Sequence, residues 1–280
     1  MTTDRRSFLA GGGAFALAAS LCGTASAADP IRIAFVPEVA TTAESLAAKQ
    51  PFVDYFQQRL RRSVKLVIPT NYAATVEALG NGSVDVAHFG ALTYLKAQAR
   101  YGARPIAQRV EDKRFHSLFI TNAANVEGLK DLKGKTFAFG DVNSTSGHLI
   151  PAAELIAAGI DPEKDLTTRF SGNHTNTAVA VASGQVVAGA LDETVYKKLA
   201  ADKTIDVAKA RVFYTSKPFV DYVWTVRKDL DAPTVAAVTA AFLEMKDPKV
   251  LEVTRASAYV AADDHEYDAD RTVARALHLL

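Results

Sequence analysis

Three consecutive hydroxyl residues followed by a glycine are the sharpest chemical feature of this sequence. Ser144, Thr145, Ser146 and Gly147 follow an apolar run at 136–139 and precede a helix-forming run. Serine and threonine side chains cap the first turn of a helix, and the amides of that turn attract anions. Gly147 would let the backbone approach such an anion closely. An ordinary capped helix fits the same pattern, so this motif alone leaves both interpretations open.

A motif that occurs twice supplies a second signal. Residues 71–87 and 173–189 each begin with asparagine and a polar ring residue, Tyr72 or His174. Each continues through a helix-forming run to a glycine and then a strand-forming run. An α/β unit that occurs twice predicts two similar lobes. In each lobe the N-terminus of a helix would face a space that the two lobes share. His174 lies at such a junction rather than on an apolar face, so a ligand contact and a structural role both fit it.

Two further segments could contribute to the same space. Residues 90–94, which include Tyr94, form another junction between a strand and a helix. Asp221 lies in an apolar stretch where the chain is expected to return between lobes, either as a hinge hydrogen-bond acceptor or as a cleft residue. An ionised carboxylate would repel an anion, whereas a shared proton would favour singly protonated oxyanions. The combined pattern predicts a donor-rich site for a compact oxyanion.

The elements that must position these residues alternate regularly along the chain. Expected strands are 31–36, 64–68, 84–89, 105–109, 117–121, 136–139, 186–191, 212–214 and 222–226, and expected helices are 43–61, 73–79, 92–101, 147–158, 175–182 and 233–245. Alternation with short connections predicts an α/β fold built from two open, mostly parallel sheets. In such sheets ligands bind beyond the carboxyl ends of the strands, where helices begin.

The chain is expected to cross between the two lobes near 121–123 and near 214–216. Lobe 1 then comprises 29–121 and 217–280, and lobe 2 comprises 122–216. A chain that crosses twice leaves a hinge of two strands, which permits closure around a ligand.

The first 27 residues have the pattern of a twin-arginine export signal. Asp4–Leu9 contains the arginine pair, an apolar run follows, and Ala25–Ala27 has the small residues of a cleavage site. The apolar run is shorter than the ~20 residues that span a bilayer. We therefore expect cleavage after Ala27 and a soluble periplasmic product, with lipid attachment at Cys22 as the lesser alternative.

Composition excludes several classes of site. The 280 residues contain one cysteine and carry a formal net charge of +1. Because Cys22 falls in the export signal, the mature chain would have no disulfide, thiolate metal site or cysteine nucleophile. A chain so close to neutrality offers no basic field for nucleic acid. No His/Asp/Glu spacing resembles a metal site, and we expect a monomer without metal or cofactor.

These motifs together resemble the periplasmic phosphonate- and phosphite-binding proteins of ABC importers. The resemblance covers about residues 31–231 and is carried by Asn143–Gly147, Gly172–His174 with Ala180–Ala182, Val84–Gly90 and Asp221–Trp224. It implies a two-lobed type II periplasmic-binding-protein fold, with two open α/β sheets joined by a two-strand hinge. It further implies closure on phosphonate, phosphite or phosphate and delivery of that ligand to a permease in the inner membrane.

The resemblance also implies roles for individual residues. The hydroxyl trio would hold the phosphoryl oxygens, two residues from opposite lobes would add donors, and others would complete the pocket or line it. Ser144, Thr145 and Ser146, with Gly147, are the trio that would hold the oxygens, and Tyr72 and His174 are the donors from opposite lobes. Asp221 would complete the pocket, and Tyr94 would line it. Phe115, Tyr72 and Trp224 would form an aromatic wall.

Two departures from the family pattern bear on the ligand. Thr194 stands where aminoalkylphosphonate-binding members have a carboxylate that receives the ligand amine, and the adjacent Glu193 would point elsewhere. Val187 replaces an aspartate in the second copy of the motif, whereas the first copy keeps Asp85. The first departure favours phosphite, methylphosphonate or phosphate over an amino-bearing ligand.

Two alternatives share the same residues. A sensory binding protein that presents its ligand to a membrane kinase would have the same pocket and a different surface partner. A hydrolase would use Ser144 or Ser146 as nucleophile, His174 as base and Asp221 to orient the base. The hydrolase is the weaker alternative, because the sequence has no Gly-x-Ser-x-Gly elbow.

Overall fold

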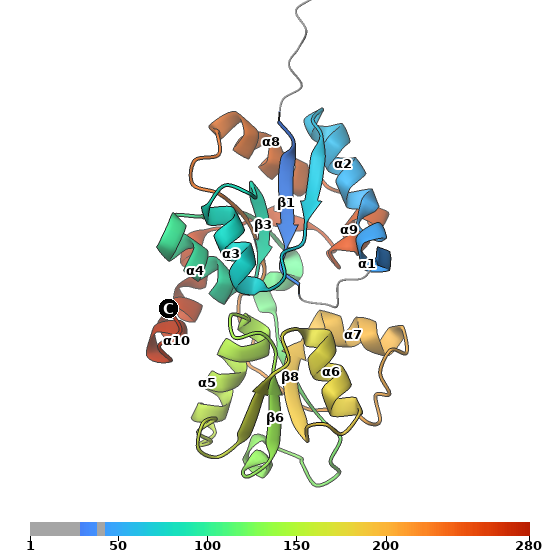
Figure 1. Cartoon of the computed structure of the whole chain (residues 1–280), viewed down its shortest axis with the longest axis vertical. Helices are drawn as coiled ribbons and strands as arrows, with labels where there is room; N and C mark the ends of the chain where they lie inside the picture. Colours follow the sequence, from blue (N-terminus) through green and yellow to red (C-terminus); the bar gives the residue numbers. More distant parts are fainter. Residues whose placement is uncertain (1–28, 38–42) are drawn as a thin grey trace, which may run out of the picture.

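The chain folds around two β-sheets, one in each half of the molecule along its long axis (Figure 1). The computed structural model describes residues 29–37 and 43–280. The predicted export signal, 1–27, lies outside the described residues. None of the helices in the described ranges is long and apolar enough to cross a membrane.

The larger sheet has six strands in the order β11-β4-β10-β3-β1-β2. Its strands are β1 (Ile31–Phe35), β2 (Val64–Val67), β3 (Val86–Phe89), β4 (Arg104–Arg109), β10 (Val223–Val226) and β11 (Tyr259–Ala261). β1 runs parallel to β2 and β3, whereas β10 runs antiparallel to β3 and β4. We call the elements of this sheet lobe 1.

The smaller sheet has five strands in the order β7-β6-β8-β5-β9. Its strands are β5 (Ser117–Thr121), β6 (Thr136–Phe139), β7 (Thr167–Phe170), β8 (Ala188–Asp192) and β9 (Arg211–Thr215). β6 runs parallel to β7 and β8, and β5 runs antiparallel to β8 and β9. We call the elements of this sheet lobe 2. Both sheets are mixed, because β10 and β11 in the first sheet and β5 in the second run opposite to the other strands of their sheets. The expectation of mostly parallel strands therefore holds for the direction of most strands but not for every pairing.

Helices cover both faces of each sheet, and we assign each helix and its flanking loops to the lobe whose sheet it covers (Figure 1). The α-helices are α1 (Ala43–Ala47), α2 (Gln50–Leu60), α3 (Tyr72–Gly80), α4 (Ala91–Tyr101), α5 (Ile150–Ala157), α6 (His174–Ala182), α7 (Glu193–Ala201), α8 (Ala232–Leu243), α9 (Pro248–Val253) and α10 (Asp268–Ala276). Short helical turns are η1 (Val110–Arg114), η2 (Leu129–Leu132), η3 (Thr145–Leu149) and η4 (Asp264–Tyr267). The single helix expected at 43–61 is two helices, since Pro51 occupies the first turn of α2 and cannot continue a preceding helix.

The twice-written motif folds into two matching units. Asn71 and Asn173 are extended N-caps of α3 and α6, and each side chain accepts from the third amide of its helix at 2.8 Å. Both units end at a glycine with positive φ, 75° at Gly82 and 77° at Gly184, a conformation that glycine adopts without steric cost. The repeat therefore places Tyr72 and His174 at equivalent first positions of two helices.

Two chain segments cross between the lobes side by side. The backbones of Phe115 and Phe219 exchange hydrogen bonds of 2.9 and 3.0 Å. β5, which the sequence places at the end of lobe 1, pairs with β8 and β9 in the second sheet. The first crossing therefore lies before Ser117.

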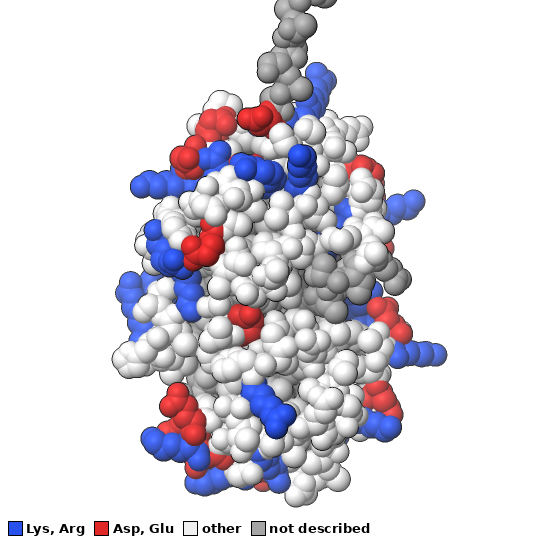
Figure 2. Space-filling view, in the orientation of Figure 1, with Lys and Arg blue, Asp and Glu red and all other residues white. Residues whose placement is uncertain are grey.

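Each sheet is buried between two apolar clusters, as the alternation of side chains along its strands requires. Ile33 and Phe35 face one cluster in lobe 1, and Ala34 and Val36 face the other. Trp224 packs in the first of these clusters, with its ring 5.4 Å from that of Phe52. On the outer surface, charges of both signs are interspersed over the face shown in Figure 2.

Candidate functional site

The structure buries all eight predicted site residues. Seven of them lie on the segments that meet where the lobes face each other, between the carboxyl ends of β3, β6 and β8. The eighth, Tyr94, is directed elsewhere, as described below. The exposed fractions of Ser146, His174 and Asp221 are all 0%. Buried polar groups are almost always hydrogen-bonded, so a buried group without a partner here points to a ligand.

The hydroxyl trio forms a turn of π-helix, η3, with Ser144 as its N-cap. The Ser144 Oγ accepts from the Gly147 amide at 3.0 Å, and the Thr145 Oγ1 accepts from the Leu92 amide of the opposite lobe at 2.9 Å. The Ser146 Oγ is buried without a hydrogen-bond partner among the described residues. Ser146 is thus the hydroxyl whose donor and acceptor positions are both unused, whereas Ser144 and Thr145 act as acceptors in these bonds and their O–H groups can still donate to a ligand.

Gly147 brings the trio against His174. A Cβ at Gly147 would lie 2.9 Å from the Ser144 Oγ, 3.1 Å from the His174 Cε1 and 3.2 Å from the Gly140 Cα. The Gly140 amide also donates to the Gly147 carbonyl at 2.8 Å. Only glycine leaves room for this contact between η3, the end of β6 and the imidazole.

His174 is held by hydrogen bonds at both ring nitrogens. Its Nδ1 accepts from the Asp192 amide at 3.3 Å, which assigns the proton of the neutral ring to Nε2. The Nε2 lies 3.3 Å from the Tyr222 hydroxyl of lobe 1 and can donate to it. The Tyr222 ring stacks on His88 at 4.9 Å and lies under the Arg109 guanidinium at 5.0 Å. Tyr222, which was not predicted, therefore links the imidazole to lobe 1.

Asp221 faces the junction from lobe 1. Its Oδ1 accepts from the Ala91 amide at the start of α4 at 3.1 Å, and its Oδ2 has no hydrogen-bond partner among the described residues. Burial raises the pKa of Asp221 well above its usual range, and the negative charges of Asp192 and Asp112 raise it further. A protonated Asp221 presents an O–H donor instead of a repelling charge.

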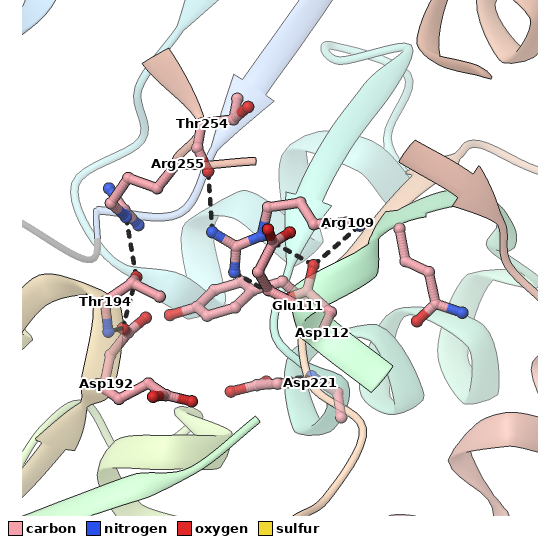
Figure 3. A network of polar contacts seen from close by, with 12 residues as sticks. Arg109, Glu111, Asp112, Asp192, Thr194, Asp221, Thr254 and Arg255 are labelled. Atoms are coloured by element: carbon pink, nitrogen blue, oxygen red, sulfur yellow. Dashed lines mark hydrogen bonds and ion pairs between the residues drawn. The ribbon is translucent and has the colours of Figure 1, made fainter. Parts of the chain in front are cut away.

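Asp192 faces the junction from lobe 2, opposite Asp221 (Figure 3). Its Oδ1 caps α7, accepting from the Thr194 amide at 2.6 Å, the Val195 amide at 2.9 Å and the Thr194 hydroxyl at 2.7 Å. Arg255 of lobe 1 donates in turn to the Thr194 Oγ1 at 2.9 Å. The sequence predicts that this strand ends at Leu191, but β8 ends at Asp192. The prediction therefore did not identify Asp192 as the residue at the end of the strand.

Arg109 is the one fully buried lysine or arginine in the described ranges. It is paired with Asp112, with Nη2 2.6 Å from the Asp112 Oδ1 and Nε 2.8 Å from Oδ2, and donates to the Thr254 carbonyl at 2.8 Å (Figure 3). Burial nevertheless raises the pKa of Asp112 to about 6, against the lowering effect of Arg109. The pair lies behind Tyr222 and adds little net charge to the site.

The two predicted tyrosines differ in their placement. Tyr72 begins α3, and its backbone amide donates to Asp141 of the opposite lobe. The Tyr94 hydroxyl instead donates to Asp264, and its ring packs on Tyr267. The structure therefore turns the Tyr94 hydroxyl towards the C-terminal segment rather than towards the hydroxyl trio.

The predicted aromatic wall is only partly assembled. Trp224 is buried in the core of lobe 1, because it shares a face of β10 with Val226 and lies on the side opposite Val223. Phe115 instead packs edge-on against Tyr222, with ring centroids 5.7 Å apart. Phe115 and Tyr222 therefore pack together, whereas Trp224 lies in the core of lobe 1.

The residues next to the trio do not form a hydrolytic triad. The contacts of the two His174 nitrogens described above are with the Asp192 backbone amide and the Tyr222 hydroxyl, and not with a serine hydroxyl or a carboxylate. Glu193, as expected, points away: it accepts from the His116 amide at 3.1 Å and pairs with Lys197. Within the described ranges, no group of acidic, histidine or cysteine side chains could hold a metal ion. The arrangement suits holding a ligand through hydrogen bonds.

Comparison with known proteins gives a consistent result. Residues 33–267 match the family described as ABC transporter, phosphonate, periplasmic substrate-binding protein. A probable ABC transporter phosphite binding protein, PhnD1, from Prochlorococcus marinus (strain MIT 9301) is 29% identical over 246 residues, covering 81% of this chain and 83% of that protein. The phosphate-import protein PhnD of Mycolicibacterium smegmatis is 30% identical over 190 residues, covering 62% of this chain and 59% of its own length.

A solved structure supports the same relationship. PhnD1 from Prochlorococcus marinus (MIT 9301) in complex with methylphosphonate superposes with a TM-score of 0.82 at 27% identity, over 89% of this chain and 98% of that one. The predicted two-lobed type II periplasmic-binding-protein fold is thereby confirmed.

Proposed function

The chain belongs to the periplasmic substrate-binding proteins of phosphonate ABC transporters, and from this premise we propose which ligand it takes and which residues hold it. The ligand is a small phosphorus oxyanion: phosphite, methylphosphonate or phosphate. It is bound where the two lobes meet and delivered to a permease in the inner membrane, without chemical change. The relatives described as binding phosphite, phosphate and methylphosphonate support this range.

The observation that carries the proposal is a pair of buried donors without partners. The Ser146 hydroxyl and the Oδ2 of Asp221 are both fully buried and unpartnered among the described residues. A protonated Asp221 and a serine hydroxyl can both donate to phosphoryl oxygens. Donors to a charged group form stronger hydrogen bonds than donors to a neutral one. An oxyanion between the lobes would therefore satisfy groups that the protein leaves unsatisfied.

The rest of the ligand set follows from position. Tyr72 and His174 begin helices α3 and α6, whose N-terminal dipoles favour negative charge. Thr145, Ser144 and Gly147 shape the turn that presents Ser146. The Tyr94 ring would contribute only as part of the surrounding wall, since its hydroxyl is committed to Asp264.

The ligand lacks an amine in this proposal. Thr194 is hydrogen-bonded to Asp192 and Arg255, so a guanidinium cation lies at that side of the site. An ammonium group brought to Thr194 would meet like charge. Glu193, which is adjacent to Thr194 in the sequence, is directed at His116 and Lys197 instead.

The wider assignments are part of the same proposal. Residues 1–27 would direct twin-arginine export to the periplasm, where the protein acts as a monomer. The lobes would move as rigid bodies about the paired crossings at Phe115 and Phe219, the geometry of hinge closure.

Isothermal titration of the purified protein tests the ligand. We expect binding of phosphite, methylphosphonate or phosphate at micromolar concentrations, and weak or no binding of 2-aminoethylphosphonate. Heat from none of the first three would exclude the proposed ligand class. Tight binding of the aminophosphonate would contradict the role given to Thr194 and Arg255.

A further inference from the structure

Asp192 has one carboxylate oxygen that the fold fully uses and one that it does not use. Its Oδ1 accepts three hydrogen bonds at the start of α7. Its Oδ2 is buried and has no hydrogen-bond partner within the described ranges, and the whole residue is 0% exposed. A buried acceptor without a donor is costly, so this oxygen points to a group that the protein itself does not supply.

The unused oxygen lies in the site proposed above. The Asp192 backbone amide donates to His174, and the side chain faces Asp221 across the junction (Figure 3). Asp221 in turn converges with Thr145 on Gly90, where an added Cβ would lie 3.0 Å from the Asp221 Oδ1 and 2.9 Å from the Thr145 Oγ1. Asp192, Asp221, Thr145 and His174 therefore lie together at the junction of the lobes.

The two carboxyl groups are not chemically equivalent. The Asp192 Oδ1 accepts three hydrogen bonds, whereas the Asp221 Oδ1 accepts one, from the Ala91 amide. Burial raises the pKa of Asp221 well above its usual range, and the neighbouring Asp192 raises it further, so we place the proton on Asp221. Asp221 is then a donor and Asp192 an acceptor.

Resting on the proposed function, we infer that the Asp192 Oδ2 accepts a hydrogen bond from a hydroxyl group of the bound oxyanion. Asp192 thereby selects ligands that carry a proton on oxygen, such as hydrogen phosphonates, hydrogen phosphite and hydrogen phosphate. Sulfonates and sulfate have the same shape and no such proton. They would place an oxygen lone pair against an ionised carboxylate, so the site discriminates against them by repulsion as well as by a missing hydrogen bond.

The substitution Asp192→Asn tests this inference. Asparagine is as good an N-cap as aspartate, so its carbonyl oxygen can keep the contacts of Oδ1 while an NH2 donor replaces the acceptor Oδ2. Methylphosphonate and methanesulfonate form the matched ligand pair, titrated in mildly acidic buffer where methylphosphonate retains one proton. Asp231→Asn is the control, because Asp231 is an exposed N-cap of α8, remote from the site.

We expect Asp192→Asn to bind methylphosphonate at least about tenfold more weakly than wild type and to lose most of the preference over methanesulfonate. Asp231→Asn should bind like wild type. Equal affinity of Asp192→Asn and wild type for methylphosphonate would overturn the inference, and so would an equal loss for both ligands. If the wild type binds no phosphorus oxyanion at all, the proposed function fails and this inference fails with it.

A second variant covers the case in which Asp192→Asn does not fold. Asp192→Ser keeps a capping oxygen and removes Oδ2 without adding a donor. It should also narrow the preference for methylphosphonate over methanesulfonate, and an unchanged preference in a variant that melts like wild type would contradict the assignment. Phosphate and sulfate provide an independent second ligand pair for both variants.

Discussion

Ser146 isolates the contribution of one hydroxyl to binding. Because its Oγ has no partner among the described residues, Ser146→Ala removes no hydrogen bond from the protein described here. It does remove a donor to the proposed anion, which should cost about 1–3 kcal/mol of binding free energy. Titration calorimetry with methylphosphonate measures this loss. The urea midpoint should stay unchanged or rise slightly.

Ser183→Ala is the matched control for that measurement. Ser183 is exposed, and its hydroxyl donates to the Ala180 carbonyl near the end of α6. It should bind methylphosphonate with wild-type affinity. Wild-type affinity in Ser146→Ala would remove Ser146 from the ligand set.

Asp221 makes stability depend on pH in a defined direction. Its pKa is raised by burial and by Asp192 and Asp112, so the folded protein binds more protons at this residue than the unfolded chain does. Its contribution to stability therefore falls as pH rises from the ordinary carboxyl range through the folded pKa. Asp221→Asn, which keeps an acceptor for the Ala91 amide and cannot ionise, removes this loss.

In the difference in stability between wild type and Asp221→Asn, the contributions of the other carboxyl groups to the pH dependence cancel. Urea denaturation without ligand should give similar stabilities in acid, below the ordinary carboxyl range, and a more stable variant at neutral pH. Parallel curves across the whole range would show that Asp221 titrates normally in the folded protein.

The sequence predicted a site residue correctly where a local pattern, such as a helix start, determines its position. The hydroxyl trio and His174 follow strands and start helical turns, and these are local properties. Tyr222 and Asp192 were missed because their roles arise from β10 and β8, which belong to different sheets and meet only across the junction. Trp224 was misplaced for a related reason, since the face of β10 that it occupies depends on the register with β3.

At the scale of elements, the two copies of the α/β unit provide an internal comparison. Asn71 and Asn173 cap α3 and α6 with closely similar geometry. Replacing either with alanine should cost about 1 kcal/mol of unfolding free energy, because a capped amide loses its acceptor. The two losses, measured by urea denaturation, should be similar, because each variant removes the acceptor of one third-position amide.

Both cap variants should also weaken methylphosphonate binding, because each asparagine directly precedes a proposed ligand residue. Asn173 immediately precedes His174, which contacts Tyr222 across the junction, and Asn71 immediately precedes Tyr72. A loss of stability in only one of the variants would show that the repeat has diverged in structure as well as in sequence.

Elements were predictable where apolar runs were long. β1, β3 and β6 are buried and β-branched or aromatic, and they lie within one or two residues of the expected bounds. β7 was missed because three of its four residues are exposed at a sheet edge, where the sequence need not be apolar. α10 was missed because it is strongly polar and buries only Asp270 and Ala274.

At the scale of the whole molecule, contacts between the lobes define the closed arrangement. The Thr93 hydroxyl donates to the Asn143 carbonyl at 2.9 Å, and the Lys96 Nζ donates to the Asn143 Oδ1 at 2.7 Å. α10 reinforces this side of the junction, since Ala274 is buried with Leu92 of lobe 1 and Leu149 of lobe 2. The repeated motif predicted two lobes. The contacts between the lobes join residues that are far apart in the sequence, so a local motif could not predict them.

Gly90 offers a direct test of closure. It lies at the start of α4 with φ −73° and ψ 163°, a conformation open to alanine. A methyl group there would lie 2.9 Å from the Thr145 Oγ1 of lobe 2 and 3.0 Å from the Asp221 Oδ1. Gly90→Ala should therefore hold the lobes apart and weaken methylphosphonate binding at least about tenfold, or about 1.4 kcal/mol. Small-angle scattering with saturating ligand should show the variant more extended than wild type.

Gly128→Ala distinguishes blocked closure from a weakened helix start. Gly128 is also an N-cap, of η2, and its added Cβ would meet nothing closer than the Asp131 Oδ2 at 4.0 Å. Both variants lose the small advantage of glycine over alanine at an N-cap, but only Gly90→Ala obstructs the opposite lobe. If Gly90→Ala compacts on ligand addition as wild type does, Thr145 does not approach α4 in the bound state. The junction would then close along a different path from the one these contacts define.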